Sequence, residues 1–394
     1  MTKCYSLGVR LRAMVIFRQL LDDPVLLHLR RLLESDSAND GVSQYALFVA
    51  ALYEQGDNLS DYLLNLVLQD ENLYMLRAAR QKPISPSLAE CLEQELLLLE
   101  EISRLSPQTL REALSYDGFL PPYYNTGHDF RAAYAQRIAQ IGCHGYGIFA
   151  GSRAFVLQNH KLVPVRHPDP ITLDGLPGYQ RERQLVVNNT LALLEGRPAA
   201  NVLLYGDSGT GKSSTVKAVV NEYAHRGLRL IELKKNQLVE IPALLDRLSD
   251  NPLRFILFID DLSFTKDDDN FAALKAILEG SISYKNDNVA VYATSNRRHL
   301  VKENFSDREG DEIHLGDTIA ELTSLSDRFG LTVTFERPGK QQYIDIVLCL
   351  AQLNGLILPE ETLIASAESY ALRRAGRSPR VAKQFIESLL AEQV

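Results

Sequence analysis

The sequence has few cysteines, and none of them stands at a spacing that builds a structural site. All four lie far apart, at Cys4, Cys91, Cys143 and Cys349. No CxxC pair and no Cys/His ligand pattern is present, so neither a disulfide framework nor a zinc site is expected. The N-terminal segment also lacks the uninterrupted apolar core of a signal peptide, because Arg10, Arg12 and Arg18 interrupt it. Both absences favour a reduced, cytoplasmic protein.

Long apolar runs and a charge excess in one half of the chain are missing as well. Near-continuous apolar runs, such as residues 45–53, 191–194 and 255–259, are far short of the about 20 residues that cross a bilayer, so a membrane-spanning protein is excluded. The net charge of −8 is divided into −3 for residues 1–170 and −5 for residues 171–394. Binding to nucleic acid through bulk charge is therefore not supported, although the local strip Arg297, Arg298 and His299 remains able to contact phosphate.

What the sequence does contain is enough apolar material for folded domains. Its 394 residues, 45% of them apolar, predict about two or three domains. Between residues 11 and 115 apolar side chains recur at three- and four-residue spacings between breaker residues, which predicts a mainly α-helical N-terminal domain over residues 1–165. Residues 116–180 are rich in aromatic residues, Pro and Gly. We expect a boundary there, with two short strand-like stretches, YGIFAG and RAFVLQ.

From residue 181 onward, apolar runs of strand length alternate with helical patterns. Strands are expected at Asn201–Tyr205, Leu228–Leu233, Arg254–Asp260, Val289–Ser295 and Leu331–Phe335. One helix is expected between the first of these strands and about Arg226, and two more are expected near 241–249 and 270–280. Strands separated by helices form parallel βαβ units, so the fold class is α/β, a doubly wound parallel sheet over residues 166–337. Residues 338–394 are helical again and predict a small helical lid.

A phosphate-binding loop follows the first of these strands. Residues 206–213 have the sequence GDSGTGKS and fit the pattern G-x-x-x-x-G-K-[ST] between a predicted strand and a predicted helix. In such a loop backbone N–H groups face phosphate oxygens, the lysine bridges the β- and γ-phosphates, and the serine hydroxyl coordinates Mg²⁺. We expect Lys212 to face solvent until a nucleotide binds, and Ser213 to be the magnesium ligand. The predicted nucleotide-binding residues are Gly206, Asp207, Ser208, Gly209, Thr210, Gly211, Lys212, Ser213 and Ser214.

A second predicted strand ends in two carboxylates. The string FILFIDD places Asp260 and Asp261 directly after five apolar residues. Asp260 is expected to hold the Mg²⁺ shell. Asp261 stands where many such ATPases have Glu as the group that polarises the attacking water. Because Asp is one methylene shorter, we expect the same role with slower hydrolysis.

Three further polar residues stand at positions from which they can reach the phosphates. Asn296 ends the strand in the string YATSN, where it can reach a γ-phosphate or its water. Arg328, in the string LSDRFG, precedes the last strand and is expected to reach the γ-phosphate of a neighbouring subunit. Arg380, in the string GRSPR, opens the final helix, with Ser378 as N-cap and Pro379 in the first turn, and is expected to reach the phosphates of its own subunit.

In this order the motifs resemble the AAA+ ATPases over residues 170–394. Longer strings, among them NVLLYGDSGTGKSS, FILFIDDLSF, VYATSNRRHL and GRSPRVAKQF, are similar to an uncharacterised bacterial family of predicted AAA+ ATPases, catalogued as a domain of unknown function. The resemblance implies an αβα core with a helical lid, ATP and Mg²⁺ as cofactors, and an ATP site at the subunit junction of a homo-oligomer. It also implies Asn296 as the first sensor, Arg328 as the trans-acting finger and Arg380 as the second sensor.

The function predicted from these features is an oligomeric Mg²⁺-dependent ATPase that acts on a macromolecular partner, protein or DNA, away from membranes. The alternative is an ATP-gated assembly or binding switch with little hydrolysis, DNA-associated like the helicase loaders, to whose acidic pair Asp260 and Asp261 are similar. A kinase is disfavoured because the two arginines and Asn296 would be idle in a monomer. A GTPase is disfavoured because no Asn-Lys-x-Asp motif follows the loop, and an unfoldase because residues 234–240 lack an aromatic-hydrophobic-Gly loop.

Overall fold

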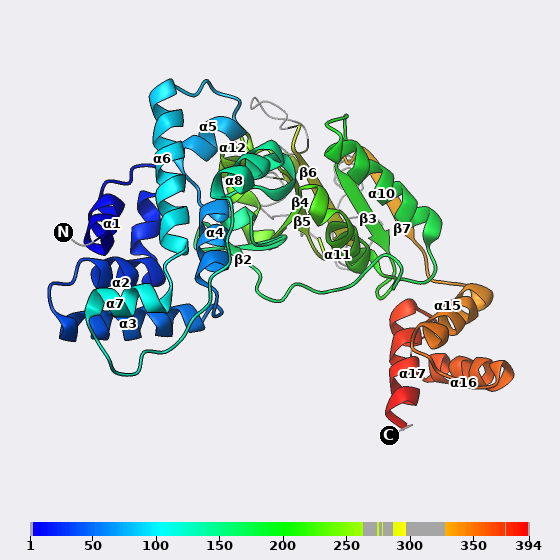
Figure 1. Ribbon diagram of the computed structural model, residues 1–394. Coiled ribbons are helices and arrows are strands. Elements are labelled where there is room, and N and C mark those ends of the chain that lie inside the picture. Colours follow the sequence, from blue (N-terminus) through cyan, green and yellow to red (C-terminus); the bar gives the residue numbers. More distant parts are fainter. Residues whose placement is uncertain are drawn as a thin grey trace. The chain divides into compact units, whose positions relative to one another are not determined.

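The computed structural model describes residues 3–262, 274–275, 278, 287–296, 328–374 and 376–392 (Figure 1). The chain divides into two compact units, Met1–Gly151 and Ser152–Val394. The basic strip Arg297–His299 and most of the helix expected near 270–280 lie outside the described residues. None of the described helices combines the length and the apolar character needed to cross a membrane.

The first unit is helical, as its apolar spacing predicts. Its elements are α1 (Lys3–Arg12), η1 (Arg18–Asp22), α2 (Pro24–Leu33), α3 (Ala38–Tyr53), α4 (Leu59–Gln69), α5 (Leu73–Ala79), α6 (Pro86–Ser103), α7 (Pro107–Leu114), α8 (Phe130–Ala139), α9 (Ile141–His144) and η2 (Gly147–Phe149). Short polar side chains cap the helices: Asp23, Ser85 and Asp129, for example, accept hydrogen bonds from backbone N–H groups of the first turn. The core includes fully buried Phe17, Phe48 and Tyr134.

One of the two strand-like stretches expected near the boundary is not a strand. YGIFAG, residues 146–151, forms the 3₁₀ turn η2. Gly145 and Gly147 have φ values of 69° and 56°, which break the extended backbone on both sides of Tyr146. The apolar composition of this stretch is typical of a strand, but the two glycines give it the backbone of a turn, so the strand expected here is wrong.

The second unit is built on one sheet of seven strands. They are β1 (Ala154–Gln158), β2 (Lys161–Pro164), β3 (Val202–Gly206), β4 (Leu228–Leu233), β5 (Arg254–Ile259), β6 (Val289–Ser295) and β7 (Leu331–Phe335), in the spatial order β2-β1-β4-β5-β6-β3-β7. All neighbours are parallel except β1 and β2, which form an antiparallel hairpin. RAFVLQ is thus a strand as expected. It belongs to the sheet, so the second unit begins at Ser152, before the boundary predicted at residue 165.

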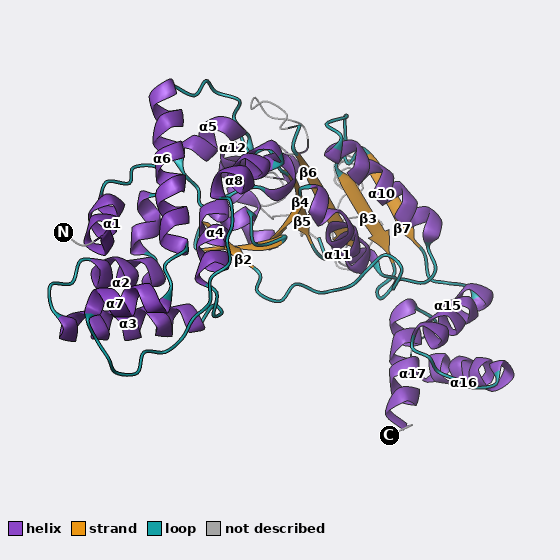
Figure 2. Ribbon diagram, viewed as in Figure 1, coloured by secondary structure: helices purple, strands orange, loops and turns teal. Residues whose placement is uncertain are grey.

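Helices cover the sheet and protect its apolar strands. α10 (Gln180–Leu194) and α11 (Lys212–Tyr223) pack against each other, α10 on β7 and α11 on β4 and β6 (Figure 2). Short helices also lie between the strands in the described part of this unit, namely η3 (Ala224–Arg226), η4 (Lys235–Glu240) and α12 (Ile241–Leu248). The central strands are buried along nearly their whole length, as expected for parallel strands covered on both faces. This confirms the α/β fold class.

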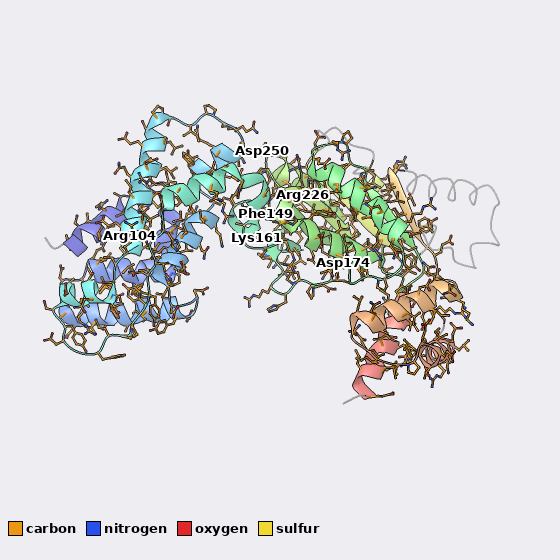
Figure 3. All side chains as sticks on the ribbon, turned by 45° about the vertical axis from the view of Figure 1, so that its right-hand side comes forward. Arg104, Phe149, Lys161, Asp174, Arg226 and Asp250 are labelled. Carbon is orange, nitrogen blue, oxygen red and sulfur yellow. The ribbon has the colours of Figure 1, made fainter. Side chains whose placement is uncertain are left out.

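Three helices follow the sheet and form the predicted helical C-terminal region. They are α15 (Lys340–Leu353), α16 (Glu360–Arg373) and α17 (Pro379–Glu392). Tyr343, Ala367 and Phe385, one from each helix, are buried in their common core. The long connection between β2 and α10, which carries Asp174, runs over the surface of the same unit (Figure 3). These two regions supply the apolar part of the cavity described next.

Candidate functional site

The phosphate loop lies between β3 and α11, where the sequence predicts it. Gly206 ends β3 at a φ of 137° and lies so close to β7 that an added Cβ would come within 2.0 Å of the Phe335 carbonyl oxygen. Gly209 has a φ of 78°, and a Cβ there would meet the Arg380 side chain at 3.0 Å. Thr210 Oγ1 donates to the Asp207 carbonyl oxygen at 2.8 Å and tightens the turn. Only glycine fits the first position, because backbone atoms cannot move aside as a flexible side chain can.

Lys212 is buried, contrary to the expectation that it faces solvent. Only 6% of its surface is exposed. Its Nζ donates to the carbonyl oxygens of Gly206 and Asp207 at 2.9 and 2.8 Å, and to Asn296 Oδ1 at 3.0 Å. Burial lowers the pKa of this ammonium, while the nearby carboxylates of Asp207, Asp260 and Asp261 oppose the shift. The lysine is therefore already held inside the loop, by acceptors that a phosphate would replace.

The acidic pair at the end of β5 is held by two neighbouring segments. Ser213 Oγ donates to Asp260 Oδ1 at 2.6 Å, and Asn296 Nδ2 donates to Asp261 Oδ1 at 2.8 Å. The parallel register places the carboxyl ends of β3, β5 and β6 at one edge of the sheet, so the three predicted motifs meet there. This edge, at a point where neighbouring strands are not consecutive in sequence, is where open α/β sheets bind ligands.

Thr294 also contacts the acidic pair, although it is not among the predicted site residues. It is 2% exposed, and its hydroxyl contacts both aspartates of the pair. The available signal was its position in the string YATSN, two residues before Asn296, where a polar residue interrupts an apolar strand. Because alternation along a buried strand is weak, that signal did not separate Thr294 from an ordinary strand residue.

Arg380 lies beside the phosphate loop. Ser378 Oγ accepts from the backbone N–H of Val381 at 3.2 Å and α17 begins at Pro379, which matches the predicted cap. The backbone N–H of Arg380 donates to the Gly209 carbonyl oxygen at 3.1 Å. The bidentate ion pair of Arg377 with Glu368, at 2.9 and 2.7 Å, ties the segment before α17 to α16 and holds the pKa of the Glu368 carboxyl below its usual range. The lid thus contacts the phosphate loop directly.

Arg328 is not brought together with the other predicted residues. It precedes β7, whose last residue, Phe335, pairs with Gly206 at the phosphate-loop edge of the sheet. A strand of five residues covers about 16 Å, so Arg328 and the loop of the same chain lie at opposite ends of the strands. Ser324–Asp327, the preceding part of its motif, lie outside the described residues.

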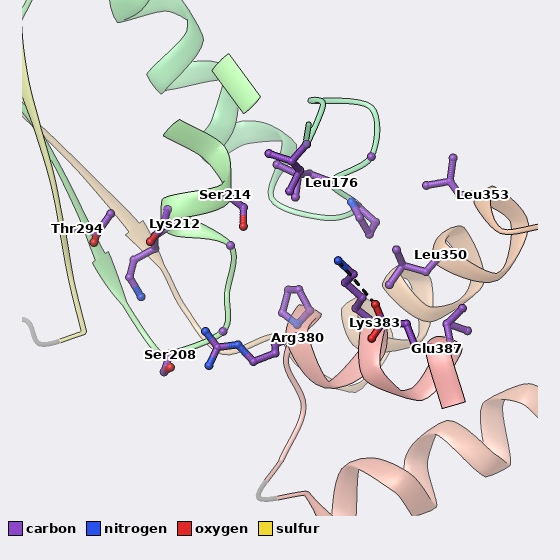
Figure 4. A pocket seen from close by; sticks show the side chains of 18 of the residues that line it. Leu176, Ser208, Lys212, Ser214, Thr294, Leu350, Leu353, Arg380, Lys383 and Glu387 are labelled. Atoms are coloured by element: carbon purple, nitrogen blue, oxygen red, sulfur yellow. Dashed lines mark ion pairs between the residues drawn. The ribbon is translucent and has the colours of Figure 1, made fainter. Parts of the chain in front are cut away.

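A cavity of about 800 Å³ joins these elements (Figure 4). One side is polar and carries the phosphate loop with Lys212, the acidic pair, Thr294 and Asn296. The other side is mostly apolar and is lined by Ile171, Leu176, Pro177, Leu350, Leu353 and Ile386. In Figure 4 the Arg380 side chain extends towards Ser208, and Leu176 and Leu350 approach from different elements. This size and division suit a ligand with an apolar ring and a charged tail.

The oxygen atoms at this edge also fit a magnesium ion bound with a nucleotide. Ser213 Oγ and Asp260 Oδ1 lie 2.6 Å apart beside the loop that would hold the phosphates. Mg²⁺ prefers hard oxygen ligands and is commonly held by one or two protein groups together with phosphate oxygens and water. The two residues predicted as metal ligands thus have the chemistry and the proximity that such a site needs.

The unit that contains this site matches a known protein family. Residues 150–393 match the model of a family described as "Protein of unknown function (DUF815)". No curated protein matches the chain. Similar solved structures include the RuvB Holliday junction branch migration motor of Thermotoga maritima, at 17% identity and a TM-score of 0.38 over 55% of this chain and 63% of that one. A variant of the same protein matches at 16% identity and a TM-score of 0.36, over 56% of this chain and 65% of that one. The chain therefore spans less than two thirds of the length of these structures. Since the family model covers more than half of the chain, the protein belongs to the DUF815 family.

Proposed function

We propose that this protein is an oligomeric Mg²⁺-dependent ATPase of the AAA+ type, whose cycle drives a conformational change on a macromolecular partner. The observation that carries the proposal is the meeting of Lys212, Ser213, Asp260, Asp261 and Asn296 at one edge of the sheet. Residues with these roles in phosphoryl transfer bind phosphate, hold the metal, activate water and sense the γ-phosphate. No other set of described residues in this unit combines them.

The cavity supports a nucleotide as the ligand. The triphosphate would lie on the backbone N–H groups of residues 207–213 at the N-terminus of α11, where the helix dipole favours negative charge. The base would lie between the β2–α10 connection and the lid, against Leu176, Pro177 and Leu350. Bound between Ser213 and Asp260, Mg²⁺ would supply charge neutralisation of the β- and γ-phosphates.

Within this site the residues have separate tasks. Lys212 would exchange its bonds to the Gly206 and Asp207 carbonyl oxygens for phosphate oxygens. Asp261 would accept a proton from the water that attacks the γ-phosphate, and Asn296 would orient that water. Arg380 would reach the phosphates from the lid, and Arg328 would act on the site of a neighbouring subunit.

The test is steady-state ATP turnover in the presence of Mg²⁺. Asp261→Asn is expected to bind ATP like the parent but to lose at least about 99% of its turnover, because an amide cannot accept the proton. Asp246→Asn, the same change on an exposed residue of α12, is the matched control and should turn over at the parent rate. Parent protein without Mg²⁺-dependent turnover, or an Asp261→Asn variant as active as the parent, would overturn the proposal.

A second candidate is an ATP-gated binding switch with little hydrolysis, associated with DNA. The observation that favours it is the state of Asp261, whose carboxylate is short and already accepts a hydrogen bond from Asn296 at 2.8 Å. This bond occupies one acceptor site of the Asp261 carboxylate and so reduces its capacity to accept a proton from water. Turnover at saturating ATP, measured with and without DNA, separates the two candidates: the switch predicts tight ATP binding with almost no turnover in either condition.

A further inference from the structure

Thr294 joins the two consecutive aspartates that end the neighbouring strand. The register of β5 and β6 pairs Ile259 with Ala293, so the next residue on each strand, Asp260 and Thr294, also lie side by side. Thr294 Oγ1 donates to Asp260 Oδ1 at 2.5 Å and accepts from the backbone N–H of Asp261 at 2.9 Å. A hydroxyl has one proton to donate, and here that proton goes to Asp260 while a lone pair serves Asp261.

The backbone of Asp261 depends on this contact. Its φ is 52°, in the left-handed region that residues other than glycine adopt infrequently. Its N–H is held by the Thr294 hydroxyl, and the N–H of the following residue, Leu262, donates to the Thr294 carbonyl oxygen at 2.7 Å. The direction of the Asp261 side chain is set by this turn, because a change in φ would swing its carboxylate away from Asn296. Thr294 therefore holds the turn through both its side chain and its backbone.

The contact to Asp260 has a second consequence. In this structure Asp260 Oδ1 accepts from both Ser213 and Thr294. If Ser213 turned a lone pair towards a metal ion, its hydroxyl proton could point to another acceptor. The hydrogen bond from Ser213 to Asp260 is therefore the one that nucleotide binding would alter. Thr294 lies on a buried strand and has no such second task. It is the donor that would keep Asp260 in one orientation throughout the cycle.

We infer that Thr294 is a positioning residue for hydrolysis, whose hydroxyl orients Asp260 towards the metal site and Asp261 towards the attacking water. The inference rests on the proposed ATPase function. This role needs the hydroxyl group itself. We therefore expect Thr294→Val, which keeps the branched shape, to be impaired and Thr294→Ser, which keeps the hydroxyl, to behave like the parent.

The experiment compares these two variants with the parent in the full chain. Calorimetric titration with ATP in EDTA reports binding by the phosphate loop, and titration with ATP and Mg²⁺ reports the metal-dependent gain in affinity. In Thr294→Val we expect unchanged affinity in EDTA, loss of most of the Mg²⁺-dependent gain, and turnover lowered about tenfold to a hundredfold, the range for losing a hydrogen bond to a charged group. Thr294→Ser should stay within about threefold of the parent in all three measurements.

A matched control accounts for simple destabilisation. Thr190 on α10 is also fully buried, and its hydroxyl contacts the Val186 carbonyl oxygen at 2.9 Å and the Tyr292 hydroxyl at 2.8 Å, but neither aspartate. Thr190→Val should lower the melting temperature without changing the Mg²⁺-dependent gain. If Thr294→Val does not fold, Thr294→Ala removes the same hydroxyl and leaves room for water at the freed N–H.

Two results would overturn the inference. One is a hydroxyl-free variant with the parent's Mg²⁺-dependent gain and turnover. The other is a Thr294→Ser variant as impaired as Thr294→Val, which would assign the effect to packing of the methyl group. A parent protein without turnover would contradict the proposed function alone, because the two titrations would still decide whether Thr294 orients Asp260.

Discussion

Glu95 is a buried carboxylate in the first unit, outside the candidate nucleotide site, and it holds a connecting segment of the backbone. Glu95 on α6 is 6% exposed, and its two carboxylate oxygens accept from the backbone N–H groups of Val15, Ile16 and Phe17 at 2.6 to 3.2 Å. One side chain thereby satisfies three consecutive N–H groups of the segment that connects α1 to η1. The free energy at stake is large because the N–H groups of Ile16 and Phe17, both buried residues, would otherwise have no partner.

Glu95→Gln should therefore lower the free energy of unfolding of this unit by about 2–4 kcal/mol, since the amide nitrogen would face donors instead of accepting from them. Guanidinium unfolding of the full chain, followed by circular dichroism, measures the change. Glu101→Gln on the same helix is the control: Glu101 pairs with the half-exposed Arg10, so its loss should cost at most about 0.5 kcal/mol. Equal changes in the free energy of unfolding for the two variants would show that the Glu95 hydrogen bonds stabilise the unit no more than an exposed ion pair does.

At the same scale, the nucleotide site shows where sequence reasoning works and where it stops. The spacing of glycines, lysine and serine predicts a phosphate loop because the chemistry of phosphate binding requires these residue types in this order, and a loop with positive-φ glycines lies there between β3 and α11. The burial of Lys212 could not be predicted, since it depends on the carbonyl oxygens of Gly206 and Asp207 turning inward. Thr294 was missed for a related reason: its role comes from strand pairing between residues more than 30 positions apart in sequence.

At the scale of elements, the contact between the lid and the phosphate loop has the clearest functional consequence. α17 is joined to the loop by the bond from the Arg380 N–H to the Gly209 carbonyl oxygen, and Arg337, just before the lid, donates its N–H to Asp207 Oδ2 at 3.1 Å. Phosphates bound in the loop would add contacts to the Arg380 guanidinium. Nucleotide binding is thereby expected to change the dynamics of α15, α16 and α17 together.

Arg380→Ala should remove this response. In the parent, ATP is expected to slow hydrogen exchange in α15–α17 by about tenfold, the effect of one added charge-assisted contact, and the variant should show almost none of this protection. Arg373→Ala, at an exposed position of α16, serves as the control and should respond like the parent. ATP-induced protection of equal size in Arg380→Ala and the parent would leave Arg380 without a role in coupling the lid to the nucleotide.

The elements themselves were largely predictable from the sequence, with two instructive failures. The strands β3 to β7 appear within one or two residues of their predicted bounds, because buried parallel strands are continuous apolar runs. The strand β1 is expected within the boundary region, but its hairpin partner β2 is not, since β2 has only four residues and a single buried one. YGIFAG has similar composition to a strand, yet two glycines with positive φ turn it into a 3₁₀ turn.

At the scale of the whole molecule, the position of Arg328 favours action between subunits. Arg328 precedes β7 at the sheet edge opposite the phosphate loop, so it cannot reach the γ-phosphate site of its own chain without taking the sheet apart. In a head-to-tail assembly each subunit offers one face as the site and another as the donor. The proposed assembly would place Arg328 on the donor face.

Mixing two inactive variants tests this arrangement. Arg328→Ala keeps a complete site but no finger, and Asp261→Asn keeps the finger but no working site. Each alone should be nearly inactive, while a one-to-one mixture should recover up to about a quarter of parent turnover, because about one junction in four then combines an intact site with an intact finger. No recovery, when crosslinking shows that the subunits do exchange, would mean that Arg328 does not act across a junction.

The proposed function requires that the buried loop around Lys212 binds the phosphates of ATP, and calorimetric titration of ATP with Mg²⁺ into the parent and Lys212→Ala measures this binding. Lys212→Ala should remain folded but lose ATP affinity by about a hundredfold or more, because the ammonium that neutralises the phosphates is gone. Lys217→Ala, on the same helix but outside the nucleotide cavity, should bind ATP like the parent. Unchanged ATP affinity in a folded Lys212→Ala protein would show that this loop does not bind the phosphates.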